Sequence, residues 1–170
     1  MSMVIDYIRL MLFSAGLLVG AQLPAVVDQY AKRVDAHYIE ATKSLAGFQQ
    51  TADAFFSGDI EKLVAHYQKS DDKVFRKDAA SIQAIYLRVQ VLKAEMQWLN
   101  RSDLLRSYHV VFDANSEMMD ETMQQYSYSL LLNPQALIWG ICIAFCIAML
   151  AELLLKLGFG LIFKTKVMAK

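Results

Sequence analysis

The chain has 170 residues with 17 basic and 17 acidic side chains, and 56% of its residues are hydrophobic. A net charge of zero lacks the electrostatic attraction on which nucleic-acid binding depends, so we expect no nucleic-acid partner. The hydrophobic content also excludes a disordered chain and a disulfide-stapled miniprotein. The length allows one ordinary domain, or one small domain with membrane spans.

The first predicted element is an apolar helix near the N-terminus. Leu10 to Val27 contains no Asp, Glu, Lys or Arg, and charged side chains are costly in hydrocarbon. With the residues before Leu10, this stretch is long enough to cross a bilayer. We therefore predict a first transmembrane helix at roughly 4–27, within residues 1–27. Pro24 cannot donate a hydrogen bond to the Gly20 carbonyl, which predicts a kink there.

Two other interpretations of this segment stay open. Val19-Gly20-Ala21 resembles a signal-peptide cleavage site, and Arg9 precedes the apolar run. Against cleavage, Asp6 cancels the charge of Arg9. Both apolar segments of the chain would also suit core helices of a soluble bundle.

Residues 28–133 are predicted to form a periplasmic helical domain, because their 12 basic and 15 acidic residues give a soluble composition. From Val27 to Phe55, apolar residues recur at alternating spacings of three and four, the narrow stripe of coiled-coil packing. A later helix repeats the spacing with Ile82, Ile85, Val89, Leu92, Met96 and Leu99. We expect the two stripes to bury each other in an antiparallel hairpin.

Capping residues divide the rest of this domain. Asp59 follows the Ser57-Gly58 break and is predicted to cap a short helix. The run Ser70-Asp71-Asp72 and then Ser102 are predicted to cap two later helices. A weaker stripe then continues towards Tyr126 through Leu105, Tyr108, Phe112 and Met119. The path of residues 100–133 stays open: the chain either bends back to the membrane or forms a helix at its surface. No run alternates with period two, so strands are not expected.

The second span is predicted at residues 134–163, followed by a basic cytoplasmic tail at 164–170. Basic residues near the span ends favour both termini in the cytoplasm and residues 28–133 in the periplasm. The predicted fold is therefore all-α, with two transmembrane helices bracketing an extramembrane helical bundle that contains a long coiled-coil-like hairpin. Cys142 and Cys146 fall in the second span, where they are expected to pack as small hydrophobic residues.

Four charged residues flank or enter the spans: Asp6, Arg9, Glu152 and Lys156. Helix rise places Arg9 and Glu152 at similar depths, so an intramembrane charge network that includes an Arg9–Glu152 pair is feasible. Such a network could form a site for ions, protons or anionic lipid head groups. The alternative, which we favour, is a structural network near the interface with Lys156 reaching water.

Small residues define the predicted helix-packing faces. They recur every fourth position at Gly16, Gly20, Gly140, Ala144 and Ala148. Such faces permit close approach of helix backbones in membranes. We expect one face to pack within the chain and the other between copies.

The sequence gives no support for catalysis. His37 and Glu40 share one helical face, but a metal site would need further ligands in register on other helices. No nucleophile elbow, triad or phosphate loop is present. We predict no cofactor, no metal and no enzymatic activity.

A resemblance is carried by residues that run from the end of the first span to the hairpin. They are Gln22, Pro24, Gln29-Tyr30, His37, Glu40-Ala41, Phe48-Gln49, Phe56-x-Gly58-Asp59, His66 and Ser70-x-Asp72. These residues and the two-span plan resemble a family of bacterial inner-membrane proteins that is classed as a domain of unknown function. The resemblance covers about the first two-thirds of the chain. It implies a Gram-negative inner membrane, and it supplies no activity or catalytic residue.

From these features we expect a non-enzymatic inner-membrane protein whose periplasmic helices self-associate or dock on a larger complex. Its partners would be membrane lipids and either further copies of itself or a membrane complex. The alternative is a subunit of an ion-conducting or transport complex that uses Arg9 and Glu152.

Overall fold

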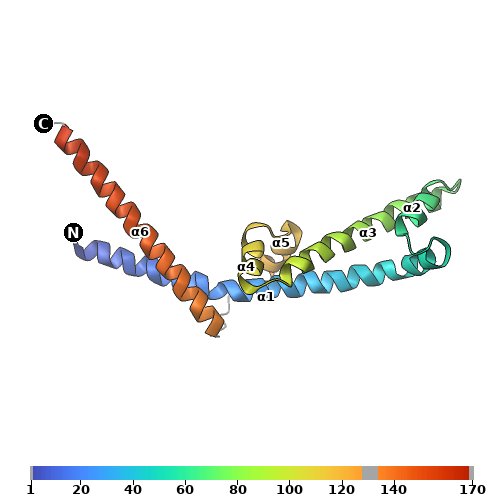
Figure 1. The fold of residues 1–170 in the computed structure, drawn as a ribbon, viewed down its shortest axis with the longest axis horizontal. Helices are drawn as coiled ribbons and strands as arrows, with labels where there is room; N and C mark the ends of the chain where they lie inside the picture. Colours follow the sequence, from blue (N-terminus) through green and yellow to red (C-terminus); the bar gives the residue numbers. More distant parts are fainter. Residues whose placement is uncertain (1, 128–133, 169–170) are drawn as a thin grey trace. The chain divides into compact units, whose positions relative to one another are not determined.

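The computed structural model describes the backbone of residues 2–127 and 134–168, and the side chains of residues 3, 6–127 and 134–153. These ranges contain six helices and no strand, which confirms the predicted all-α fold (Figure 1). In chain order the helices are α1 (Ser2–Phe55), α2 (Ile60–Gln68), α3 (Lys73–Leu99), α4 (Asp103–Phe112), α5 (Ser116–Gln124) and α6 (Pro134–Met168). The chain divides into two compact units, one formed by Met1–Val27 with Tyr126–Lys170 and the other by Asp28–Gln125.

Helix α1 is longer than either of the segments predicted for it. Its 54 residues include both the first apolar segment and the first stripe of the hairpin, and the helix continues through Pro24. Proline in a helix interior removes one backbone hydrogen bond and leaves the other turns intact. The two predicted segments therefore form one uninterrupted helix.

The first unit contains two segments that are long and apolar enough to cross a membrane, by length and composition. They belong to the helical stretches Asp6–Phe55 and Pro134–Leu153, whose most apolar windows are only 28% and 17% buried. A core helix of a soluble protein buries most of its apolar surface. Large apolar side chains such as Met11, Val19 and Ile138 are instead exposed along these segments. The exposure therefore weighs against the soluble-bundle interpretation.

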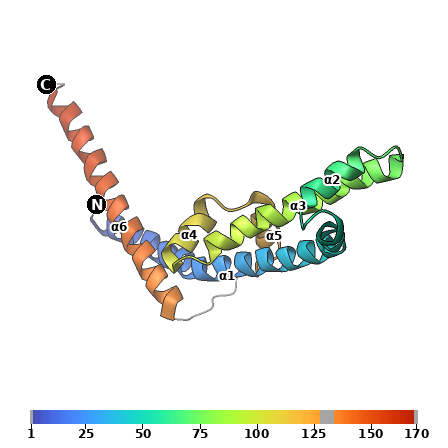
Figure 2. The ribbon, with the colours of Figure 1, turned by 45° about the vertical axis from the view of Figure 1, so that its right-hand side comes forward.

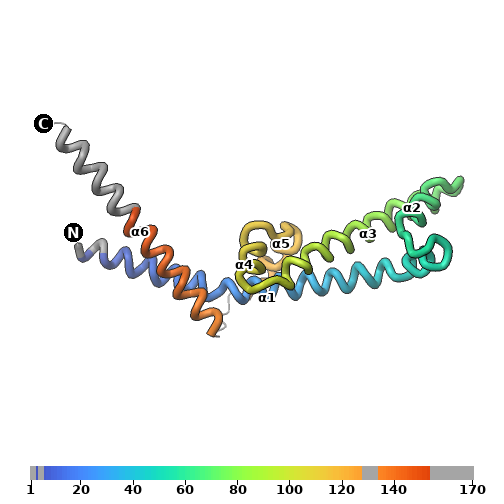
Figure 3. The backbone as a smooth tube through the Cα atoms, viewed as in Figure 1, coloured from blue at the N-terminus to red at the C-terminus, as the bar shows by residue number. Residues whose placement is uncertain are grey.

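The second unit is built on the predicted hairpin. Figures 1 and 3 show α3 returning alongside the second half of α1. Tyr30 of α1 contacts Glu95 of α3, whereas His37, one heptad later, contacts Arg88. Residue numbers thus rise on one helix as they fall on the other, which makes the pair antiparallel. The buried positions follow the two predicted stripes and include Val34, Ala41, Leu45, Ala52, Ile82, Val89, Leu92 and Leu99.

A tight reversal and α2 close the far end of the hairpin. Ser57 and Gly58 both have positive φ, at 55° and 82°, a conformation that glycine adopts at little cost. Asp59 then caps α2, as predicted, by accepting a hydrogen bond from the Lys62 amide. Asp72 caps α3 in the same way through the Val74 amide. The first stripe ends at Ala52, because Phe55 is exposed and does not join the core.

Two short helices fold against the other end of the hairpin, and Figure 2 shows α4 and α5 beside α1 and α3. Ser102 occupies the N-cap position of α4 as predicted, but its side chain makes no capping hydrogen bond. The predicted apolar stripe on α4 is not part of the core. Leu105, Tyr108 and Phe112 are exposed, and the buried face carries Ser107, His109 and Val110. The return of the chain is thus made by α3, with α4 and α5 added at its end.

Candidate functional site

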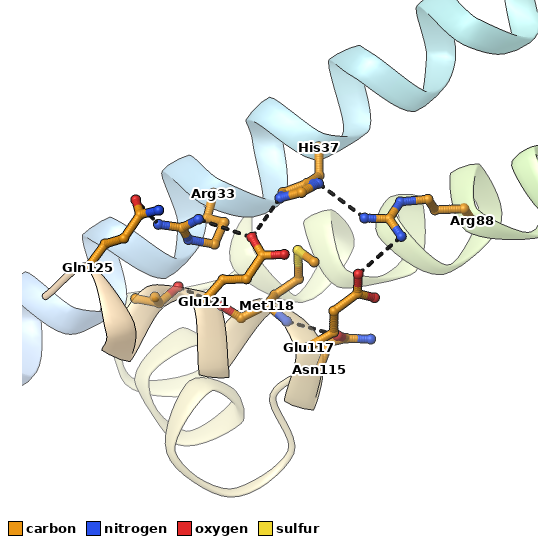
Figure 4. Close-up of polar contacts among 9 residues, drawn as sticks. Arg33, His37, Arg88, Asn115, Glu117, Met118, Glu121 and Gln125 are labelled. Carbon is orange, nitrogen blue, oxygen red and sulfur yellow. Dashed lines mark hydrogen bonds and ion pairs between the residues drawn. The ribbon is translucent and has the colours of Figure 1, made fainter.

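The largest concentration of polar contacts in the second unit joins α1, α3 and α5. Arg33 donates from Nη1 to Glu121 Oε2 at 3.0 Å and from Nη2 to Gln125 Oε1 at 2.8 Å. The same carboxylate oxygen lies 2.9 Å from His37 Nε2. Arg88 completes the set with Nη1 3.1 Å from Glu117 Oε1. Figure 4 shows these side chains converging from the three helices.

His37 occupies the centre of this cluster, and its partners fix its tautomer. Arg88 Nη2 approaches His37 Nδ1 at 3.1 Å. A guanidinium can only donate, so Nδ1 must be the accepting nitrogen. Nε2 then carries the proton and donates it to Glu121. Both ring nitrogens of the neutral imidazole are therefore occupied, and neither is free to bind a metal or to abstract a proton.

A second polar set holds α4 and the start of α5 on the hairpin. Tyr30, which is fully buried, donates to Glu95 Oε2 at 2.9 Å and accepts from the Asn115 amide at 2.9 Å. The same glutamate oxygen lies 2.8 Å from His109 Nε2, and the two side chains are only 12% and 7% exposed. Asn115 in turn caps α5 by accepting from the Met118 amide. One carboxylate oxygen thus links α1, α3 and α4.

Aromatic stacking extends this second set to the surface. The Trp98 and His109 rings lie 5.2 Å apart and nearly parallel. The Arg101 guanidinium also lies over the Trp98 ring, with its Cζ 4.1 Å from the ring centroid. A guanidinium at that distance is attracted by the negative face of the indole. The connection between α3 and α4 is therefore held by a stack of three side chains.

Two groups in the polar sets have shifted pKa values. Burial raises the pKa of Tyr30, and the charge of Glu95 and the hydrogen bond to it raise it further. The hydrogen bond from His37 lowers the pKa of Glu121, and the hydrogen bond from Arg33 adds to the effect. Tyr30 is thus kept neutral and Glu121 ionised. Those are the protonation states that these contacts require.

The contacts in these two polar sets hold helices in position relative to one another. Each titratable group is paired with a partner on another helix, and the described residues contain no group of three or more His, Cys, Asp or Glu side chains that could hold a metal ion. His37 points to Glu121 and Arg88, whereas Glu40, its predicted companion, is exposed. The two sets fix the rotation and height of α4 and α5 on the hairpin.

Comparison with protein families assigns the chain to a family. Residues 4–163 match the model of the family described as a protein of unknown function, DUF2937. The chain belongs to this family. The match confirms the predicted resemblance to a domain of unknown function, and it extends the covered region from two-thirds to nearly the whole chain. No curated protein and no solved structure is found to match this DUF2937 member.

The predicted charge network of the DUF2937 chain lies in its first unit. Arg9 Nη1 is 3.9 Å from Asp6 Oδ1, one turn away on α1. Glu152 lies on α6 and lines an apolar cavity of about 560 Å³ with Cys146, Met149, Leu150 and Leu153. The Lys156 side chain lies outside the described residues. The Arg9–Glu152 pair stays a prediction.

The small residues of α1 and α6 contact each other within the first unit. A Cβ added at Gly16 would lie 3.1 Å from Ala144 Cα, and one added at Gly20 would lie 2.9 Å from Gly140 Cα. Ala144 is fully buried and Ala148 is half-buried. The two faces thus contact each other within the chain, and packing between copies stays a prediction.

Sequence reasoning missed the residues that form the two polar sets. Tyr30, Glu95 and His109 received no functional interpretation, because their contacts join positions far apart in the sequence. Only His37 had been considered, for its spacing to Glu40. A usable signal did exist, since Tyr30 and His37 lie one heptad apart and flank the predicted stripe of α1.

Proposed function

We propose that this protein is a non-enzymatic component of the bacterial inner membrane. In this proposal α1 and α6 anchor it, both termini lie in the cytoplasm, and residues 28–133 form a periplasmic helical domain. The domain acts as a self-associating scaffold or an accessory subunit, with membrane lipids and further copies of the chain as its partners. The apolar exposed surfaces of the two candidate spans support the anchoring part.

The observation that carries self-association is a second apolar stripe on α3. It consists of exposed residues at successive spacings of four, three, four, three and four: Ala80, Ala84, Leu87, Val91, Ala94 and Trp98. The three largest are between 41% and 51% exposed. This spacing is that of the a and d positions of a coiled coil. Helix α3 therefore has two coiled-coil stripes, of which the hairpin uses only one.

The two stripes lie on opposite faces of α3. At 3.6 residues per turn, Leu87 and Val91 lie roughly half a turn of the helix away from Val89 and Leu92, which are buried in the hairpin. A stripe this narrow suits one partner helix rather than a broad surface. Its alanines would let that helix approach closely. The same stripe on a second copy meets both conditions, because an interface between identical surfaces is the commonest way for two copies to pair.

Mass measurement of the full chain in a mild detergent tests this proposal. We expect a dimer or larger species, and we expect Val91→Lys to shift it to the monomer, because the charge would be buried at the centre of the stripe. Ser81→Lys is the matched control: it places the same side chain on the exposed surface of α3, away from the stripe. A wild-type protein that is strictly monomeric would overturn self-association. Recovery of a different membrane protein with that monomer would favour the accessory-subunit form.

The proposed topology has a separate test. A cysteine introduced at Ser57, the exposed reversal beyond α1, should react with a membrane-impermeant thiol reagent added from the periplasm. Native Cys142 and Cys146 should be protected in the same cells, because the proposal puts them in the bilayer. Reaction at Ser57→Cys only after the inner membrane is disrupted would contradict a periplasmic domain.

The position of Glu152 favours a second candidate function, a subunit of an ion-conducting or transport complex. An ionisable residue within a candidate span marks a possible functional site, and the other described residues that line the Glu152 cavity are apolar. Replacing Glu152 with Gln should then change ion flux, whereas Cys146→Ala, which alters the same cavity and leaves its charge intact, should not. Unchanged flux with reduced stability in Glu152→Gln would assign the residue a structural role.

A further inference from the structure

Helix α4 exposes an apolar face that the fold does not use. Its five large apolar side chains between 48% and 70% exposed are Leu104, Leu105, Tyr108, Val111 and Phe112. On a helix these positions fall within an arc of roughly 120°. The opposite face carries Ser107, His109 and Val110, which are buried against the hairpin. The helix is thus amphipathic with its apolar face outward, the reverse of what solvent alone would favour.

The place of α4 in the second unit points to the kind of surface that could cover this face. Figures 1 and 2 show α4 crossing the hairpin at its open end instead of running along it. Arg106 lines a cavity of about 260 Å³ there together with Ala31, Lys32 and Asp35 of α1. These three α1 residues follow Val27, the last residue of the charge-free segment, by four, five and eight positions. At about 1.5 Å per residue this is a distance of roughly 6–12 Å along a continuous helix.

The nearer part of that range, at Ala31 and Lys32, falls within the head-group layer of a bilayer whose hydrocarbon ends near Val27. The polar layer on each side adds about 5–8 Å to the hydrocarbon core. A helix attached at this level is within reach of the lipid head groups. Amphipathic helices in that position bury their apolar face at the boundary between head groups and acyl chains.

The side chains beside this face have the matching chemistry. Tyr108 and Phe112 pair with ring centroids 4.9 Å apart. Trp98, in the last turn of α3, is partly exposed and carries Arg101 over its ring. Tryptophan, tyrosine and arginine are the residues that anchor proteins at the interface, because each joins an apolar body to a polar end.

A bilayer surface needs no minimum contact area to cover this face, because the candidate spans already tether the second unit to it.

We propose that α4 is an interfacial helix that lies on the periplasmic leaflet, with its Leu104–Phe112 face in contact with phospholipid. The inference rests on the anchoring part of the proposed function and is independent of self-association. It implies that the bilayer, through α4, holds the whole hairpin at a fixed height and rotation.

Depth-dependent quenching of the full chain in phospholipid vesicles tests this. An environment-sensitive fluorophore is attached at Val111→Cys in a Cys142→Ala, Cys146→Ala background. Lipids that carry a nitroxide near the head group should quench this probe several-fold more than they quench the same probe at Val74→Cys. Val74 is the matched control, because it is also an exposed valine but lies at the start of α3, by the closed end of the hairpin. Neither substitution touches a buried side chain.

Equal quenching at the two valines would overturn the inference. A Val111→Cys probe that is shielded from aqueous iodide, is not quenched by lipid, and becomes accessible when the protein is diluted in lipid would overturn it in favour of a second copy. A probe on native Cys146, read with lipids that carry the nitroxide deep in the acyl chain, separates the two proposals. If lipid quenches Cys146 and not Val111→Cys, only the inference on α4 fails. If lipid quenches neither position, the anchoring proposal fails and the inference fails with it.

Discussion

Gly20 is the position where a single methyl group should have the largest effect on the packing of α1 against α6. Its added Cβ would lie 2.9 Å from Gly140 Cα, from Ile143 Cβ and from the Trp139 carbonyl oxygen, whereas ordinary contacts begin at 3.4 Å. Two of these atoms belong to the backbone and cannot rotate away. The helices must therefore separate by about 0.5 Å, or the contact stays overpacked, at a cost of about 1–3 kcal/mol.

Gly47 supplies the matched control for this substitution. It lies in the same helix, and an added Cβ would meet no atom within 4 Å. Alanine is favoured over glycine in a helix interior by about 1 kcal/mol. Gly47→Ala should therefore stabilise the protein by about that amount. Gly20→Ala has the same gain in helix propensity and also the packing cost, so it should destabilise the pairing of α1 and α6 by about 1 kcal/mol, or at best leave it unchanged.

Trp139 is the reporter for this prediction, because its carbonyl is one of the three close contacts. We expect its fluorescence to show a lower thermal midpoint in Gly20→Ala, with Trp98 replaced by Phe in all samples to remove the second indole. Gly47→Ala should leave the Trp139 midpoint unchanged. A Gly20→Ala protein whose midpoint rises would refute the close contact between the two helices, because the change would then act only through helix propensity.

Three further predictions concern the second unit. Tyr30→Phe removes a buried hydrogen bond to a carboxylate and should cost about 1.5–3 kcal/mol in denaturant unfolding; the half-buried Tyr38, changed in the same way, should cost much less. Asp72→Ala removes the cap of α3 and should cost about 1 kcal/mol in the same assay, while Asp72→Asn should retain most of the stability. Glu121 has a lowered pKa in the folded state, so its contribution is present above its ordinary pKa of 4.5 and is lost as the pH falls further. Glu121→Gln should therefore lower the melting temperature at neutral pH and flatten its decline below pH 4.5, and an unchanged acid limb would contradict the pairing of Glu121 with its histidine and arginine partners.

Local patterns in the sequence predicted the helices of the hairpin and their ends. The stripes of α1 and α3 depend only on the helical repeat, so the spacing of apolar residues was sufficient to find them. Asp59 and Asp72 cap the helices predicted for them, because a cap needs only a side-chain oxygen and the amides of the next turn. The start of α6 at Pro134 also agrees, since proline is favoured in the first turn of a helix.

The orientation of α4 could not be read in the same way. Its periodic apolar residues suited a core face and an interfacial face equally well. In the structure the core side of α4 carries His109, whose Nε2 lies 2.8 Å from Glu95 Oε2. That contact spans 14 residues and depends on how α4 crosses α3. Periodicity gives the existence of two faces, but only the position of the buried partner decides which face is turned inward.

The exposed stripe of α3 was missed for a related reason. Its alanines did not register as apolar core positions beside the larger residues of the buried stripe. Both stripes have the same spacing, so the buried stripe was sufficient to predict the helix and a second stripe was not sought. A hairpin requires only one apolar face on each helix. The second stripe of α3 therefore points to a partner, whereas the first stripe is explained by the hairpin itself.

The polar pairs at the open end of the hairpin fix the register of α3 along α1, which the apolar stripes alone do not fix. Stripes that repeat every seven residues permit α3 to slide along α1 by one heptad and still bury apolar side chains. Tyr30 with Glu95 and His37 with Arg88 lie one heptad apart on both helices. A slip of seven residues in one direction would set Tyr30 opposite Arg88 and leave the Glu95 carboxylate without its tyrosine donor inside the fold. A buried carboxylate that loses a hydrogen-bond donor is destabilised, and His37 would lose Arg88 as well, so these pairs favour the native alignment where the apolar stripes alone do not. The same alignment decides where α4 is held, and thus the apolar face that the domain presents at its open end depends on the register of two helices that are otherwise free to slide.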